Sequence, residues 1–260
     1  MKFLYRKCVI GVVFSMVVSL TISALPAFSN THDSSWKFRL SPYAWLAGQN
    51  GSVATLPGLP PADIDIDFWD DILGNINGAL FLVGEARKDR WGIFTDIAYV
   101  NIESDNPLPI PEFSSLVSTT ESWIVTAAGM YRLADRPSKS FDIIAGIRFW
   151  SVDSTLALRA GTFPGQEISN NENWVDPLVG IRGLTTLGTS RFFCNGAAAI
   201  GGFGAGSDFM WDLSINFGYR WGEIFSTSIG YRYLDVDYED DGFLYDIAQH
   251  GPTLGLTWVF

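Results

Sequence analysis

Cysteine and basic residues are scarce in this chain. Its 260 residues include two cysteines, Cys8 and Cys194, and 17 Lys and Arg against 28 Asp and Glu, for a net charge of −11. Because Cys8 falls in a segment that we expect to be removed, no intrachain disulfide is expected in the mature protein. A basic surface, which nucleic-acid binding requires, is missing, so we expect no nucleic-acid partner.

Long apolar runs are missing after residue 29, so no transmembrane helix is expected there. The one apolar run, residues 8–22, is shorter than the ~20 residues that a bilayer-spanning helix needs. Basic residues precede this run, and small residues follow it. We therefore predict that residues 1–29 are a cleaved signal peptide and that residues 30–260 form one exported domain. Without the three basic residues of the signal, 14 Lys and Arg stand against 28 Asp and Glu, a net charge of −14.

Segments in which apolar and polar residues alternate are abundant. In 211–221, apolar and aromatic residues take the odd positions, while Asp, Ser, Asn, Gly and Arg take the even ones. A period of two predicts a strand with one apolar face, and 141–150 and 174–182 share it. A closed barrel holds such a chain together without disulfides, because every backbone group is paired around the ring. We therefore predict an all-β fold: a transmembrane, antiparallel, up-and-down β-barrel of about ten strands, with eight or twelve as the alternatives.

The expected strands determine which charged residues share a face. We place the strands at 35–48, 78–88, 90–103, 115–133, 139–156, 172–187, 190–204, 208–221, 223–238 and 243–260. In a membrane barrel the apolar face contacts lipid and the other face lines the lumen. The predicted lumen residues are Glu85, Arg87, Asp96, Asp142, Arg148, Asp176, Arg182, Asp212, Arg220 and Arg232.

The carboxylates and arginines of this set are equal in number, which predicts a network of ion pairs, because buried charges are costly unless they are paired. A barrel of about eight strands is just filled by its interior side chains, and ten strands leave little more room. A filled, rigid barrel with a structural or surface-binding role is therefore the favoured function. A narrow channel for small solutes is the alternative.

The segment 49–77 is unusual. Asp63, Asp65 and Asp67 alternate with apolar residues, and apolar residues at helical spacing follow from Phe68 to Ile76. We expect a hairpin tip with a short helical turn that Asp67 caps. The alternatives are an amphipathic helix on the membrane or in the barrel mouth, and two further strands over 50–67, which would make the count twelve.

The acidic segment 235–242 resembles part of a calcium loop. Asp237, Glu239 and Asp241 fall at positions 1, 3 and 5 of an EF-hand pattern, but position 12 is Ala248 in place of the bidentate Glu. We therefore expect an acidic surface loop and no dedicated metal site or cofactor. A weaker hypothesis is that these acids bridge divalent cations to lipopolysaccharide phosphates.

Catalysis has little support in the sequence. The two histidines are His32 and His250, and we expect His250 to point outward near the outer leaflet. A lipid A deacylase would need a Ser two residues later, where this chain has Pro252, and an omptin-type protease would need a histidine among rim acids. A base without a nucleophile is weak support for an enzyme, so we expect none. A lipid-modifying enzyme is a third alternative.

The last residues carry a resemblance to known proteins. Leu254, Leu256, Trp258 and Phe260 form an apolar stripe that ends at the terminal residue. This strand resembles the closing strand of bacterial outer-membrane barrels, which the outer-membrane assembly machinery reads during insertion. Further segments that share the resemblance are 41–48 (SPYAWLAG), 85–87 (EAR), 90–92 (RWG), 230–238 (GYRYLDVDY) and 251–256 (GPTLGL).

Together these segments resemble an uncharacterised family of proteobacterial outer-membrane proteins, and more broadly the small OmpA-type and porin-like barrels. The resemblance implies a barrel in the outer membrane of a Gram-negative bacterium, in contact with lipid and lipopolysaccharide. It implies no catalytic or binding residues, and neither it nor the sequence predicts the oligomeric state.

Overall fold

The computed structural model describes residues 35–56 and 58–260. The predicted signal peptide and His32 lie outside the described residues. Ten strands form a closed antiparallel barrel, as predicted, and two more strands extend its sheet. Among the described residues, no helix is long and apolar enough to cross a membrane.

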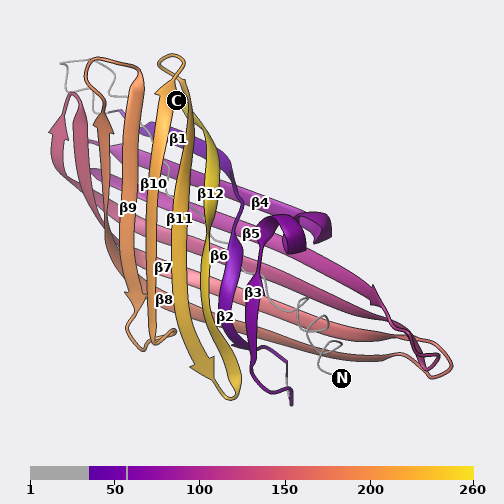
Figure 1. The fold of residues 1–260 in the computed structure, drawn as a ribbon. Helices are drawn as coiled ribbons and strands as arrows, with labels where there is room; N and C mark the ends of the chain where they lie inside the picture. The colour runs from indigo at the N-terminus through magenta and orange to yellow at the C-terminus, as the bar shows by residue number, and fades with distance from the viewer. Residues whose placement is uncertain (1–34, 57) are drawn as a thin grey trace.

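The barrel consists of the first strand and the last nine. Each of these ten strands pairs with the next of the ten along the chain (Figure 1). Pairing of β1 with β12 closes the ring. The strands are β1 (Lys37–Trp45), β4 (Ile76–Lys88), β5 (Trp91–Pro107), β6 (Phe113–Arg136), β7 (Lys139–Ala160), β8 (Gln166–Thr186), β9 (Phe192–Gly202), β10 (Phe209–Arg220), β11 (Phe225–Asp240) and β12 (Phe243–Val259). We call the end that carries the short connections and Phe260 the turn end, and the opposite end the loop end.

The two additional strands, β2 (Gly48–Ala54) and β3 (Ala62–Ile66), form a hairpin within the segment 49–77. β2 continues β1 along β12 after a bend: the β1 pairing stops at Trp45 opposite Thr253, and the β2 pairing starts at Gly48 opposite His250. At the bend a Cβ on Gly251 would lie 2.0 Å from the Leu46 carbonyl oxygen, so only glycine fits there. The strand pairing that the sequence left as an alternative is therefore present.

A short helical segment, η1 (Phe68–Ile72) followed by η2 (Leu73–Asn75), leads from β3 into β4. The Asp67 carboxylate accepts hydrogen bonds from the Trp69 and Asp70 backbone N–H groups at 2.8 and 3.2 Å, as its predicted capping role requires. Phe68 and Ile72 are buried, and the segment contacts β2, β3 and β5. The helical segment thus connects β3 to β4, which do not pair with each other (Figure 1).

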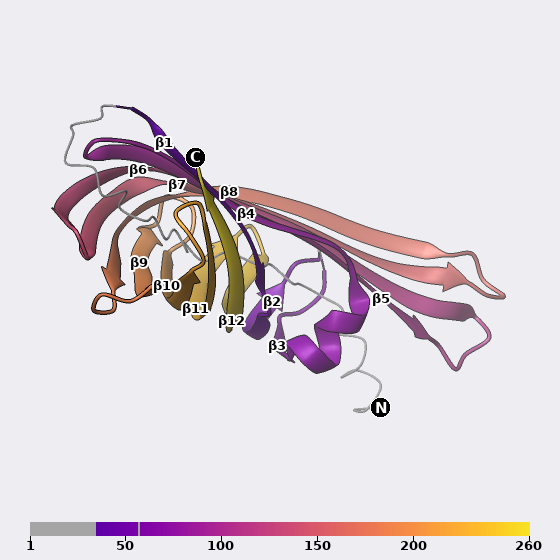
Figure 2. The same ribbon diagram turned by 90° about the horizontal axis from the view of Figure 1, so that it is seen from above.

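Strands β5–β8 run far beyond the rest of the barrel at the loop end (Figure 2). β6 has 24 residues whereas β9 has 11. β9 ends in a tight turn in which Gly202, Phe203 and Gly204 have φ of +83°, +54° and +71°, and its pairing with β8 stops at Leu178. We call the outer parts of these four strands, residues 101–123 and 151–173, the protruding sheet.

Candidate functional site in the barrel lumen

The lumen contains charged side chains that contact one another across the barrel. All ten predicted lumen residues face inward and are buried. Most of them fall into two layers, one near the turn end and one at mid-height. Neighbouring β-strand residues alternate between the two faces of the wall, so the charged side chains of β4, β5, β7, β8, β10 and β11 converge on the axis.

The layer near the turn end surrounds Glu85. Arg39 and Arg87 approach one Glu85 oxygen at 3.3 and 3.1 Å, and Arg182 approaches the other at 3.5 Å. The Asp142 carboxylate forms ion pairs with Nη2 of Arg87 and Nε of Arg132, both at 2.8 Å. Four arginines therefore share two carboxylates, and the layer carries a net positive charge.

The central layer is electrically balanced. Arg148 and Arg232 both bind Asp212, with Nη2 of Arg148 at 2.8 Å and Nε of Arg232 at 2.7 Å. Arg232 also lies 3.8 Å from Asp96, which accepts a 3.4 Å hydrogen bond from the Tyr43 hydroxyl. The Arg232 guanidinium stands 5.1 Å from the centre of the Trp45 ring, a cation–π contact that adds to its attraction for the carboxylates.

These ion pairs span the lumen. In the ring, β7 and β10 are three places apart, and β4 and β8 are four places apart, as are β11 and β5. The pairs Arg148–Asp212, Arg182–Glu85 and Arg232–Asp96 therefore join opposite parts of the wall. At two heights the interior is bridged by side chains that cannot separate without leaving buried charges unpaired.

Asp176 and Arg220 face the lumen but belong to neither layer, so the prediction that the ten residues form one balanced network is wrong. The Asp176 carboxylate accepts hydrogen bonds from Trp150 Nε1 at 2.8 Å and from the Ser207 backbone N–H and hydroxyl at 2.6 and 2.7 Å. Arg220 donates to the Thr186 hydroxyl at 3.0 Å and lies 5.2 Å from the Phe193 ring centre. Within the described part of the chain, its Nε and Nη2 have no hydrogen-bond partner.

Sequence reasoning missed Arg39 and Arg132. Arg39 lies on the polar face of the first predicted strand, and counting that face would have found it. Arg132 likewise keeps the inward parity of β6, since the register shift begins only after it and Arg132 is still paired with Asp142. Counting along the predicted strand would therefore have found it too. Together with the ten predicted residues, Arg39 and Arg132 make a set of seven arginines and five carboxylates.

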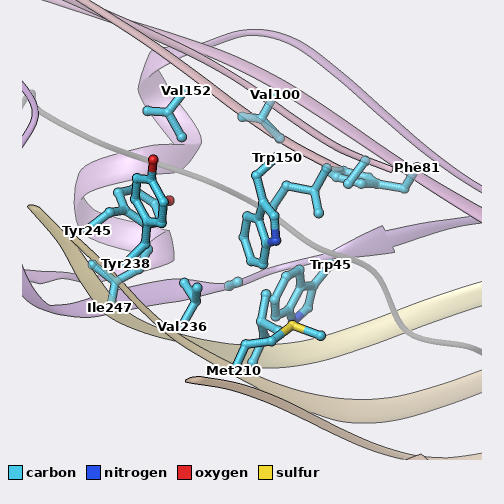
Figure 3. Close-up of a cluster of buried hydrophobic side chains, with 14 of the residues drawn as sticks. Trp45, Phe81, Val100, Trp150, Val152, Met210, Val236, Tyr238, Tyr245 and Ile247 are labelled. Carbon is cyan, nitrogen blue, oxygen red and sulfur yellow. The ribbon is translucent and has the colours of Figure 1, made fainter. Parts of the chain in front are cut away.

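Above the central layer, toward the loop end, the interior is aromatic. Trp174 stacks on Trp150 and on Tyr238, with ring centres 5.3 and 4.1 Å apart, and Figure 3 shows Trp150 close to Trp45 and Met210. The Tyr238 hydroxyl donates to Glu172 at 3.1 Å. This part of the interior differs from the charged layers below it, because buried apolar side chains from β2, β3 and the barrel strands form one cluster here.

The outward face carries the other predicted features. Leu254, Leu256 and Phe260 are exposed along β12 as one stripe, and Trp258 packs against Phe225 with ring centres 5.1 Å apart. The Phe260 backbone N–H donates to the Phe38 carbonyl at 2.9 Å. The stripe thus extends to the end of the chain and is fixed there by β1.

His250 points outward, as predicted. Its Nδ1 lies 2.9 Å from the Tyr231 hydroxyl, and its ring stacks on Tyr233 with centres 5.3 Å apart. It borders a hollow of about 250 Å³ that Asp65 and Asp67 also line. The residues that line this hollow include no serine, threonine, cysteine or lysine.

The acidic segment 235–242 forms the end of a hairpin. Asp240 pairs with Phe243 across a two-residue turn, in which Asp241 and Gly242 have φ of +42° and +84°. Positive φ at both positions is the requirement of a type I′ hairpin turn, which favours Asp-Gly. Within residues 35–56 and 58–260, no three His, Cys, Asp or Glu side chains are grouped so that they could hold a metal ion. Burial and the nearby carboxylates of Asp246, Asp208 and Glu239 raise the pKa of Asp237.

Comparisons with known proteins support the fold. No family model matches the chain, and no curated protein matches its sequence. Among solved structures, the outer membrane protease OmpT from Escherichia coli is similar at a TM-score of 0.53 and 12% identity, over 88% of this chain and 98% of that one. Ail, the attachment invasion locus protein of Yersinia pestis, is similar at a TM-score of 0.38 and 12% identity, over 86% of this chain and 98% of that one. At these identities the likeness to OmpT shows the barrel fold and no activity.

Proposed function

We propose that this protein is an integral outer-membrane barrel of a Gram-negative bacterium that does not conduct solutes and presents an acidic surface outside the cell. Its outward apolar side chains contact lipid, and its turn end faces the periplasm, because bacterial barrels have short periplasmic turns and longer outer loops. The apolar stripe that ends at Phe260 supports insertion by the outer-membrane assembly machinery. The proposal includes no catalytic step.

The ion pairs across the lumen carry the proposal. A solute that entered would have to separate pairs such as Arg148–Asp212 and Arg182–Glu85, which join strands on opposite sides of the barrel. Breaking a buried pair leaves an uncompensated charge at a free-energy cost of about 3–5 kcal/mol. Since two layers lie in series, thermal opening of both at once is rare.

The surface role rests on the protruding sheet. It carries seven acidic residues and one basic residue, Arg159; the acids are Glu103, Asp105, Glu112, Glu121, Asp153, Glu167 and Glu172. Glu121 and Asp153 are directly opposite each other on neighbouring strands, flanked by Asn101 and Asn171 in the same row. Adjacent like charges attract cations, so we propose that the sheet binds basic protein segments, or divalent cations held by lipopolysaccharide phosphates.

Osmotic swelling of phospholipid vesicles that contain the purified protein tests the proposal. We expect vesicles with wild-type protein to swell in isotonic glycine or arabinose no faster than empty vesicles. Fast swelling that falls steeply with solute size would overturn the filled barrel. A variant with a shortened protruding sheet tests the surface role; in it, paired residues are deleted from β6 within 113–123 and from β7 within 151–160. We expect this variant to insert normally and to lose binding of a lysine-rich peptide.

A narrow anion channel is the second candidate, and one observation favours it. The layer near the turn end has four arginines for two carboxylates. Arg39 Nε and Arg87 Nη1 have no hydrogen-bond partner among the residues that the structure describes. Such a lining attracts small anions. If this candidate is right, vesicles swell in isotonic ammonium chloride but not in arabinose, and Arg182→Gln slows the swelling.

A further inference from the structure

A groove of about 850 Å³ crosses the outward face of the barrel near the turn end. It lies over β8 and β9, on the face opposite to the lumen, and it opens to the surroundings of the barrel. Its lining is almost entirely apolar up to one end, where Arg136 and Lys139 border it.

Small side chains on two neighbouring strands form the floor of the groove. Thr185 pairs with Cys194 and Gly183 with Gly196, so small residues from β8 and β9 lie side by side in two rows. In the third row Ala198 lies beside the larger Ile181. The rows span four residues along the strand, which at a rise of about 3.3 Å per residue is roughly 13 Å.

Large side chains on the adjoining strands form the walls. Phe141 on β7 stands beside Gly183, and Ile215 and Leu213 on β10 stand beside Gly196 and Ala198. All three are among the exposed large apolar residues, at 37%, 49% and 51%. The groove is thus an apolar depression with large side chains along both sides, and its volume is sufficient for an acyl chain.

Arg136 and Lys139 face each other at the β6–β7 turn, and both are exposed. Asp135 in the same turn binds Arg132 and does not line the groove. In a chain that carries a large excess of acidic residues, an apolar groove that ends at two cations calls for a ligand with an apolar tail and an anionic head.

We propose that this groove binds one anionic phospholipid of the periplasmic leaflet, with an acyl chain along the floor and the phosphate at Arg136 and Lys139. The inference rests on the proposed membrane location, which puts the β6–β7 turn at the level of the periplasmic headgroups. A second copy of the chain is a poorer occupant, because a two-fold contact through this face would bring the Arg136 and Lys139 side chains of both copies together, and like charges repel.

Native mass spectrometry of the detergent-purified full-length barrel, titrated with phosphatidylglycerol, tests the proposal. We expect one lipid to remain bound to wild-type protein at an activation energy that strips lipid from its loose sites. Gly183→Trp fills the floor and is expected to abolish this binding. Arg136→Gln with Lys139→Gln is expected to weaken it at least tenfold and to lower its preference over phosphatidylcholine.

Matched variants control for folding and for general surface effects. Gly129→Trp places the same side chain at another outward-facing glycine, where, as at Gly183, the nearest atom to a Cβ would be a carbonyl oxygen at 3.9 Å. Lys88→Gln with Arg90→Gln removes the same charge from the β4–β5 turn. Both controls are expected to retain the lipid.

Three results would overturn the proposal: no retained lipid on wild-type protein, equal loss in the control variants, or a dimer that Gly183→Trp dissociates. Insertion into vesicles, scored by protection from added protease, is measured in parallel. A protein that does not insert refutes the membrane location itself, whereas one that inserts and retains no lipid refutes only the groove.

Discussion

Neutralising Glu85 is the most informative single change in the lumen. The Glu85 carboxylate pairs with Arg39, Arg87 and Arg182, and Arg87 also pairs with Asp142. Glu85→Gln therefore leaves Arg39 buried without an ion pair, and it leaves Arg182 with only the longer-range attraction of Asp142, which lies opposite it on the neighbouring strand. Removing one partner of a buried ion pair costs about 3–5 kcal/mol, so we expect the free energy of unfolding to fall by at least that amount.

Chemical unfolding of the barrel in phospholipid vesicles, followed by tryptophan fluorescence, measures this loss. Asp135→Asn is the matched control: Asp135 binds Arg132 at 3.3 Å, but its side chain is 63% exposed, and exposed pairs contribute about 0–1 kcal/mol. A second variant, Glu85→Gln with Arg39→Met and Arg182→Met, removes the stranded cations and is expected to recover most of the stability. If Glu85→Gln costs no more than Asp135→Asn, the network does not hold the barrel together.

Three further predictions concern the loop end. The pKa of Asp237 is raised in the folded state, so the folded protein binds this proton more readily than the unfolded chain does. Asp237→Asn should therefore raise the unfolding midpoint at pH 7, and this gain should vanish as the pH falls toward about 4. A gain that does not depend on pH would contradict the prediction. Gly242→Val forces a β-branched residue to a φ of +84° and should cost about 1–3 kcal/mol, measured by the same unfolding assay; an unchanged midpoint would refute the turn. Trp150→Phe removes one of three hydrogen bonds to the buried Asp176 carboxylate. It should lower the free energy of unfolding by about 1–3 kcal/mol and leave vesicle swelling unchanged. A smaller loss would mean that the other two hydrogen bonds satisfy the carboxylate.

Period-two alternation was sufficient to predict the barrel and the face on which each charge lies. Residues such as Arg148 and Asp212 lie in strands whose opposite face is apolar, so their direction follows from the pleat alone. Alternation cannot reveal which charges meet, because that depends on how far neighbouring strands are offset around the ring. The pairing of Arg182 with Glu85, four strands away, therefore became visible only in the structure.

The remaining misses have other causes. Arg39 and Arg132 lie on the inward faces of predicted strands, and counting those faces to their ends would have included both. Near the loop end the inward residues, among them Trp150 and Val152, are more apolar than outward neighbours such as Asp153. The polarity of the two faces is therefore reversed there relative to the lipid-facing part of the barrel. The acidic run before Gly242 resembles part of a calcium loop, but its Asp-Gly pair is the ordinary signal of a hairpin turn.

The electrical conductance of single wild-type barrels in a planar phospholipid bilayer tests the central claim, that ion pairs close the lumen. The account predicts no steady openings in 1 M KCl with protein whose insertion is verified independently. Steady openings whose size or ion selectivity changes in Arg148→Gln or Arg182→Gln would contradict it, because they would show ions passing between side chains that the structure places in contact.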